Sequence, residues 1–461
     1  MKSKAFLTFI TLTILLSVTT ANAQFSCMRA PDPIVIQGSL NIGDVQQAGR
    51  VTRDGKPSTC AGDTGALENG TAVRRDAHNF TNPYNETVCV RVEQDFSGCA
   101  GNQTQSIAYS NYNPAAPAAN VIGDAGYSTI NKGSYSFSVG PSANFTIVVN
   151  EIDANAGCPL YKLKVTYLRN CRQPGFDLTN DGKADPTVYR TSSISKWYTH
   201  DSETGNMFVQ NFGTVGDVVT GGNDYTGDGR SDVSVYRAGN NTWYRANSQF
   251  TPESDFTATP WGATGDRPVP GDYDGDGLSD VAVWRPSEGN FYIFRSSDNS
   301  LQSMHWGING DRMVSGDFDG DTLTDIAVVR PTSGGLQWWL LKSNYNYGFD
   351  QLVNWGLSAG DILVPADYDG DTITDIAIWR ESEGNFYVRR SSDLTMQVFK
   401  WGTTGDKAQP ADYDGDKVAD FAVFRPATST WYIYNSGTQT ARYLNWGTSG
   451  DIAITTPYRI Q

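Results

Sequence analysis

The chain has 461 residues and a formal net charge of −15, with 35 Lys and Arg against 50 Asp and Glu. Nucleic acids and anionic membrane surfaces need a cationic footprint, so this charge balance excludes both as expected partners. Only three His are present, which argues against a His-rich metal enzyme, and the 12% aromatic content predicts a packed rather than a disordered chain.

The first 23 residues are typical of an export signal. Lys2 and Lys4 give a basic start, and an apolar run follows over residues 5–18. Residues 21–23 read Ala-Asn-Ala, a small-residue cleavage pattern. The apolar run is too short to span a bilayer, and no later stretch is longer. We therefore expect cleavage near Ala23, no membrane span, and a secreted protein that is extracellular, at the cell surface or in the periplasm.

Residues 24–171 form the first predicted domain. Apolar and polar residues alternate in four segments, with Gly, Pro and Asn between them: 87–92, 134–139, 145–149 and 163–167. Period two with turn residues in between predicts strands. A β-sandwich-like domain buries one face of each sheet, so this is the expected fold.

The six cysteines of the chain all fall in this first domain: Cys27, Cys60, Cys89, Cys99, Cys158 and Cys171. An even number of cysteines in an exported chain predicts disulfides. A zinc site is disfavoured because no CxxC pair is present. Closeness in sequence favours the pairs Cys89–Cys99 and Cys158–Cys171, which leaves Cys27–Cys60, although other connectivities are open.

Residues 172–461 contain no cysteine and repeat about every 45 residues. Each unit has an Asp-rich loop, a strand ending in Arg, an aromatic pair and a turn ending in Gly-Asp. About four short strands per unit predict a β-propeller; a linear array of calcium modules is the alternative, which is disfavoured because one unit cannot bury both of its faces. Residues 451–458 repeat the first strand of a unit without its loop. They could complete the first blade, which favours six blades over the alternative of seven.

Each Asp-rich loop places side-chain oxygens at its positions 1, 3, 5 and 9. In chain order these predicted metal ligands are Asp177, Thr179, Asp181 and Asp185; Asp224, Thr226, Asp228 and Asp232; Asp272, Asp274, Asp276 and Asp280; Asp317, Asp319, Asp321 and Asp325; Asp367, Asp369, Asp371 and Asp375; and Asp412, Asp414, Asp416 and Asp420. Several hard oxygen ligands in one loop suit Ca²⁺, and clustered carboxylates without a cation repel one another. Asx-turns without metal are the alternative.

The six loops are not equivalent. The first two have Thr179 and Thr226 at position 3, where the others have Asp. The last three have Thr322, Thr372 and Lys417 at position 6, where the backbone is expected to need a positive φ and the first three have Gly. These departures bear on the occupancy of each loop rather than on the fold.

The D-x-D-x-D-G-x-x-D loops in a blade of about 45 residues resemble FG-GAP repeats, also called VCBS repeats. Such repeats form integrin-α-like propellers and occur in many exported bacterial proteins. The resemblance implies that each Asp loop binds Ca²⁺ between the first two strands of a blade, and that ligands meet the opposite face of the ring.

Two charged residues also recur once per blade. They are Arg190, Arg237, Arg285, Arg330, Arg380 and Arg425 at the strand ends, and Asp217, Asp266, Asp311, Asp361, Asp406 and Asp451 in the Gly-Asp turns. A ring of Arg could grip an anionic ligand. Pairing of each Arg with an Asp or a carbonyl is favoured, because catalysis needs one site rather than six copies.

Enzyme signatures are not found: the sequence has no GxSxG, HExxH, P-loop or dinucleotide-binding pattern. No catalytic residue and no organic cofactor is assigned, and a non-catalytic role is favoured. We expect a calcium-binding propeller that acts as a binding or adhesion module for an extracellular protein or glycan. An extracellular carbohydrate-active enzyme, such as a polysaccharide lyase or glycosidase, and a structural surface or matrix component are the alternatives.

Overall fold

The computed structural model describes residues 34–454 apart from 49, 53–57, 59–66, 70–71, 85–86, 100–103, 126–131, 155, 169–174, 248–250, 344–346, 348–349 and 358–359. The predicted signal peptide, Cys27, Cys60 and Cys171 lie outside these residues. The described residues form strands and turns without an α-helix. None of their segments is a helix with the length and apolar character needed to cross a membrane.

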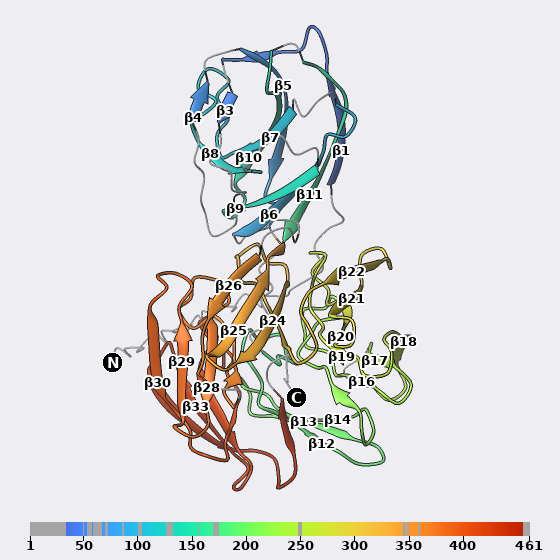
Figure 1. The fold of residues 1–461 in the computed structure, drawn as a ribbon, viewed down its shortest axis with the longest axis vertical. Helices are drawn as coiled ribbons and strands as arrows, with labels where there is room; N and C mark the ends of the chain where they lie inside the picture. The colour runs from blue at the N-terminus through green and yellow to red at the C-terminus, as the bar shows by residue number, and fades with distance from the viewer. Residues whose placement is uncertain are drawn as a thin grey trace, which may run out of the picture.

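Two sheets face each other in residues 34–168, which we call the sandwich (Figure 1). The first sheet has the order β1 (Ile34–Leu40), β11 (Cys158–Leu168), β6 (Val88–Asp95) and β9 (Lys132–Val139). The second has the order β2 (Gln46–Gln47), β5 (Val73–Thr81), β10 (Asn144–Glu151), β7 (Thr104–Tyr109) and β8 (Val121–Asp124). A separate pair joins β3 (Arg50–Thr52) and β4 (Leu67–Asn69).

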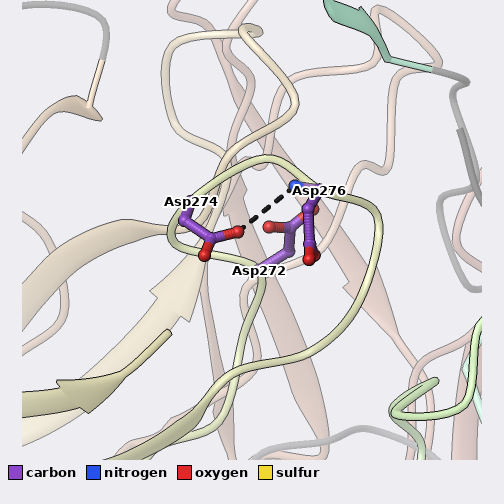
Figure 2. Close-up of side chains that lie close together, drawn as sticks. All are labelled: Asp272, Asp274 and Asp276. Atoms are coloured by element: carbon purple, nitrogen blue, oxygen red, sulfur yellow. Dashed lines mark hydrogen bonds between the residues drawn. The ribbon is translucent and has the colours of Figure 1, made fainter. Parts of the chain in front are cut away.

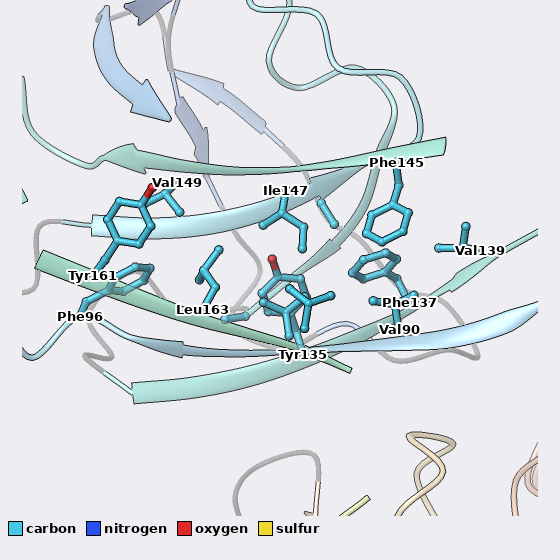
Figure 3. Packing of buried hydrophobic residues seen from close by; sticks show 14 of the residues in the cluster. Val90, Phe96, Tyr135, Phe137, Val139, Phe145, Ile147, Val149, Tyr161 and Leu163 are labelled. Atoms are coloured by element: carbon cyan, nitrogen blue, oxygen red, sulfur yellow. The ribbon is translucent and has the colours of Figure 1, made fainter. Parts of the chain in front are cut away.

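The core of the sandwich lies between its two sheets. Val90, Phe137 and Leu163 come from the first sheet, and Phe145 and Ile147 of β10 meet them from the second (Figure 3). Alternate residues of β6, β9, β10 and β11 belong to this core, as the period-two pattern predicted. The prediction of a β-sandwich-like fold is confirmed.

The described disulfide of the sandwich joins Cys99 and Cys158, with Cα atoms 4.4 Å apart. The expected pairs Cys89–Cys99 and Cys158–Cys171 are therefore wrong. β6 and β11 are antiparallel neighbours, so the end of β6 and the start of β11 meet although they lie far apart in sequence. Cys89 is also disulfide-bonded.

Residues 175–454, which we call the propeller, contain six four-stranded antiparallel sheets among the described residues. In spatial order the first three are β14 (Met207–Asn211), β13 (Lys196–His200), β12 (Thr187–Arg190) and β35 (Ile452–Ile454); β15 (Val218–Val219), β16 (Ser234–Arg237), β17 (Thr242–Ala246) and β18 (Phe256–Pro260); and β19 (Arg267–Pro268), β20 (Val281–Arg285), β21 (Asn290–Phe294) and β22 (Leu301–His305). The last three are β23 (Arg312–Gly316), β24 (Asp325–Thr332), β25 (Gly335–Leu341) and β26 (Asp350–Asn354); β27 (Ile362–Leu363), β28 (Ile376–Arg380), β29 (Asn385–Arg389) and β30 (Met396–Lys400); and β31 (Lys407–Ala408), β32 (Phe421–Arg425), β33 (Thr430–Asn435) and β34 (Thr440–Asn445). We number these sheets as blades one to six. The predicted boundary at residues 171 and 172 falls in the undescribed stretch 169–174 and stays a prediction.

The end of the chain closes the first blade. β35 pairs with β12, with Ile454 opposite Thr187, so blade one combines strands from both ends of the propeller. This is the role expected for the loop-less last copy of the repeat. Trp446 also donates its indole N–H to the carbonyl of Tyr198 in blade one at 3.1 Å.

Tryptophans hold neighbouring blades together. The indole N–H groups of four others, Trp261, Trp306, Trp355 and Trp401, donate to carbonyls of the next blade at 2.9–3.1 Å. A second set is at most 1% exposed inside the sheets: Trp197, Trp243, Trp284, Trp338, Trp379 and Trp431. These rings fill the wedges between blades, where large aromatic side chains contribute most to packing.

The recurring Arg and Asp residues pair within the blades. In all six pairs the Arg Nε and Nη2 atoms donate to the two carboxylate oxygens at 2.7–3.0 Å. Five pairs join residues of one blade, and the pair of Arg190 and Asp451 joins the two ends of the propeller. The favoured interpretation of these residues as structural partners is confirmed.

Candidate metal centre

The six Asp loops occupy the same place in every blade. Each lies directly before the blade's second strand; in blade three, Asp272–Asp280 connects β19 to β20. An isolated bridge between Gly271 and Asp280 closes the base of this loop. The position between first and second strands is the one that the sequence resemblance implied.

The carboxylate at position 1 organises the backbone of its loop. In blade three, Asp272 accepts hydrogen bonds from the N–H groups of Gly275 at 2.6 Å and Gly277 at 3.0 Å. The same two bonds, to positions 4 and 6, recur in the other five loops. One folded loop conformation is therefore shared by all six copies.

Position 6 has a positive φ in every loop. Gly277 has a φ of 84°, and the non-glycine residues Thr322, Thr372 and Lys417 have values of 73°, 73° and 72°. An L-residue in this left-handed region is strained by its Cβ. The expectation of a positive φ at these three residues is confirmed, and the sequence departure leaves the loop backbone unchanged.

The carboxylate at position 9 ties the loop to the following hairpin. Asp280 accepts from the N–H of Tyr273 at 2.8 Å through one oxygen and from the N–H of Ser296 at 2.7 Å through the other. Asp325 and Asp420 do the same in blades four and six. This residue thus positions the loop against the end of the blade's third strand.

Carboxylates converge in four of the six loops. One oxygen from each member of a group lies within 4.8 Å of the others in these sets: Asp272, Asp274 and Asp276; Asp317, Asp319 and Asp325; Asp367, Asp369 and Asp371; and Asp412, Asp414 and Asp420. Figure 2 shows the set in blade three, where the three side chains surround one point inside the loop. Three convergent carboxylates in a tight loop fit a hard divalent cation such as Ca²⁺.

Loops one and two differ from the other four. Within the described part of the chain, their acidic residues form no such group of three. Thr179 donates its hydroxyl to Asp177 at 3.4 Å, and Thr226 donates to Asp224 at 3.5 Å. The hydroxyl at position 3 therefore interacts with the carboxylate at position 1, and these two loops offer fewer anionic ligands.

The electrostatics of the loops favour a bound cation. Burial, with the nearby Asp274 adding to it, raises the pKa of Asp280 to about 8. Burial also raises the pKa of Asp375 and Asp420 to about 7 and that of Asp412 to about 6. Carboxylates with raised pKa values are poorly stabilised as anions, and a bound divalent cation would supply the compensating positive charge.

Backbone hydrogen bonds join the six loops into one ring. The N–H at position 8 of each loop donates to the carbonyl at position 1 of the preceding loop, at 2.6 or 2.7 Å. The pairs, donor first, are Ser231–Asp177, Ser279–Asp224, Thr324–Asp272, Thr374–Asp317, Ala419–Asp367 and Ala184–Asp412. The side chain of each position-1 Asp therefore accepts hydrogen bonds within its own loop, and its backbone carbonyl accepts one from the next loop. This ring could not be predicted from side-chain patterns, because main-chain atoms form it.

A surface depression of about 420 Å³ lies between blades two and three. Asn240, Trp261, Arg285, Tyr292 and Leu301 are among its lining residues. Sequence reasoning missed it as a site, because its aromatic and Arg residues recur in every blade. Asn240, in the turn after β16, is the lining residue that could have marked it.

Comparisons with known proteins agree with the repeat. Residues 224–310 match a family model described as an FG-GAP-like repeat. No curated protein matches the chain.

Solved structures similar to the chain include three from different organisms. A lectin of Agrocybe aegerita, described as recognising non-reducing terminal N-acetylglucosamine, is 16% identical with a TM-score of 0.40, over 63% of this chain and 92% of its own. An auxiliary nutrient binding protein of Bacteroides ovatus is 11% identical with a TM-score of 0.34, over 81% and 99%. AztD of Citrobacter koseri is 8% identical with a TM-score of 0.32, over 60% and 99%.

The family match falls on the second and third Asp loops, and the other four loops share their backbone hydrogen bonds. Residues 224–310 of the chain therefore contain an FG-GAP-like repeat.

Proposed function

We propose that the protein is an exported, calcium-stabilised propeller that acts as a non-catalytic binding module. The observation that carries this proposal is the convergence of three carboxylates in each of four loops. Bound Ca²⁺ would neutralise each cluster and hold the loop beneath its blade. The residues that would hold it are the four sets that converge in blades three to six, with position 5 or 9 as the third carboxylate.

The recurring Arg and Trp residues have structural partners, which leaves the depression between blades two and three as the candidate binding surface. The six Arg are engaged by Asp partners, and indole N–H groups of the recurring Trp bond to carbonyls, so these residues serve the scaffold. The depression between blades two and three is lined by Trp261 and Tyr292 beside the amides of Asn240 and Asn241. The guanidinium of Arg285 lies over the Tyr292 ring, 4.5 Å from its centroid. Amide and guanidinium donors beside aromatic edges suit a glycan or a polar peptide segment. An extracellular glycan or protein is therefore the proposed ligand class.

Export is proposed from the first 23 residues and is consistent with the disulfide between Cys99 and Cys158. Disulfides persist in oxidising compartments and are rare in the cytosol.

The calcium role is tested by titrating the chelator-treated mature protein with Ca²⁺ in a calorimeter. Asp276→Asn should remove or weaken one binding site, whereas Asp298→Asn, an exposed carboxylate in the turn after β21, should leave the titration unchanged. Equal titrations for both variants would contradict the assignment of the loop in blade three.

The ligand role is tested on a glycan array and a panel of extracellular proteins, with Ca²⁺ and again with a chelator. Leu301→Arg introduces a large cation at the depression and should abolish binding. Met396→Arg is the matched control, because Met396 is the equally exposed first residue of the corresponding strand in blade five. Binding that survives Leu301→Arg would place the ligand elsewhere.

A further inference from the structure

The Asp loop of blade four is covered more completely than the others. Asp321, at position 5, is fully buried, and Asp319 is 8% exposed. The position-5 residues of blades three and five, Asp276 and Asp371, keep partial exposure to solvent. A segment from outside blade four therefore shields the carboxylates of this loop from solvent.

Arginines of the same blade contact the loops of blades three and five. The Nε of Arg295 lies 3.2 Å from Asp274 Oδ2, and that of Arg390 lies 3.2 Å from Asp369 Oδ2. Arg295 directly follows β21, and Arg390 directly follows β29. Blade four has Lys342 at the corresponding place after β25, so it lacks this guanidinium.

The guanidinium at the loop of blade four comes from the sandwich. Arg91 on β6 donates from Nη1 to Asp321 Oδ2 at 3.0 Å. The Arg91 residue is 9% exposed, and its Nε also lies 3.9 Å from Glu93. The other oxygen of Asp321 accepts from Ser343 Oγ at 2.8 Å and from the N–H of Leu323 at 3.0 Å.

An apolar contact accompanies this ion pair. Cys89, two residues before Arg91 on β6, packs with Leu323 of the loop, and both are almost fully buried. Figure 1 shows β6 at the end of the sandwich that faces β24, β25 and β26. The loop of blade four is thus both a candidate cation site and the place where the sandwich meets the propeller.

The convergent group of blade four leaves out the carboxylate that Arg91 contacts. Asp317, Asp319 and Asp325 form the group, and Asp321 is not among them. In blades three and five the position-5 residue belongs to the convergent group. Blade six has the same grouping, without Asp416, so the ion pair of Asp321 with Arg91 is what sets blade four apart.

We propose that the guanidinium of Arg91 acts as a built-in cation at the Asp loop of blade four. Binding of Ca²⁺ at this loop and docking of the sandwich then oppose each other, because both use the charge of Asp321. This inference rests on the calcium role proposed above. A guanidinium and Ca²⁺ draw on the same carboxylate charge, and two cations held close together in a buried contact repel. Because linkage is reciprocal, Ca²⁺ at this loop weakens docking by the factor by which docking weakens Ca²⁺ binding.

The test compares Arg91→Met with Arg390→Met in the mature full-length chain, by calorimetric Ca²⁺ titration and small-angle X-ray scattering. Arg91→Met should tighten one Ca²⁺ site by about five-fold or more and increase the radius of gyration in the presence of a chelator. Arg91→Lys, which keeps the charge, should retain most of the wild-type behaviour. Arg390→Met also removes a guanidinium from a loop, but it should leave the radius of gyration unchanged.

A double-mutant cycle identifies the route of the coupling. If Asp321 carries it, Arg91→Met should have little further effect on the Ca²⁺ titration in an Asp321→Asn background. Wild-type protein that binds Ca²⁺ with an affinity and a radius of gyration unaltered by Arg91→Met would overturn the coupling alone. Wild-type protein that binds no Ca²⁺ would overturn the proposed function, and the coupling with it.

Discussion

The sandwich and the propeller bury different chemistry. The sandwich has one continuous apolar core between two sheets, exemplified by Phe137 and Phe145, and a disulfide that joins the turn after β6 to the start of β11. The propeller has several smaller apolar clusters between blades, and it also buries a ring of carboxylates and six Arg–Asp pairs. We therefore expect the two regions to lose stability under different conditions: the sandwich when its disulfide is reduced, and the propeller when its cations are removed.

Chelation is expected to have the largest effect on this contrast. A bound ion stabilises the native state by about 1.4 kcal/mol per site when its free concentration is ten times the dissociation constant. Four occupied loops would then contribute roughly 6 kcal/mol, all in the propeller. Scanning calorimetry with a chelator should lower the melting temperature of the propeller and leave that of the sandwich nearly unchanged. An equal fall in both melting temperatures would contradict this contrast between the two regions.

The pH dependence of the metal-free propeller should be opposite to that of an ordinary acid-denatured protein. The pKa of Asp280 is raised to about 8 and those of Asp375 and Asp420 to about 7, from the ordinary Asp value of 3.8. The native state then binds more protons than the unfolded state. The contribution of these three carboxyls to stability is complete below about pH 4 and is lost as the pH rises through 7 to 8. Melting curves from pH 5 to 8.5 in chelator should show this loss, and saturating Ca²⁺ should remove it, because the ion binds the ionised carboxylates.

Loss of the disulfide should affect the sandwich alone. Replacing Cys99 and Cys158 together by Ser removes a constraint on the unfolded chain and is expected to cost about 2–5 kcal/mol. Denaturant unfolding followed by proteolysis of each region would locate the loss. If the propeller were destabilised as much as the sandwich, the two regions would be one cooperative unit.

Ring closure should have a smaller effect that is specific to the ends of the propeller. Arg190→Met leaves the buried carboxylate of Asp451 without its bidentate partner, which is expected to cost about 1–3 kcal/mol. Arg285→Met makes the same change within blade three. Hydrogen exchange should show β35 and β12 opening faster in the first variant and only β20 and its neighbours in the second. Identical exchange patterns would mean that the pair of Arg190 and Asp451 has no special role in closure.

The repeats made most of the propeller predictable from sequence. Each Asp loop is local, so comparison of its copies predicted the positive φ at Thr322, Thr372 and Lys417. The resemblance to FG-GAP repeats implied the position of the loops between the first two strands. The copy number of the recurring Arg favoured a structural role, but it left open whether the partner is an Asp or a backbone carbonyl. What could not be predicted depends on which distant segments become neighbours: the pairing of Cys99 with Cys158 follows from the adjacency of β6 and β11, and the contact of Arg91 with Asp321 follows from docking of the sandwich.

The central claim is that the Asp loops hold Ca²⁺, and counting the metal tests it most directly. The mature protein would be saturated with Ca²⁺, passed through a desalting column and measured by inductively coupled plasma mass spectrometry. About four ions per chain are expected from the four convergent groups, and substituting Asp274 and Asp276 together by Asn should remove one. A calcium content no higher than that of a protein without such loops would contradict the account.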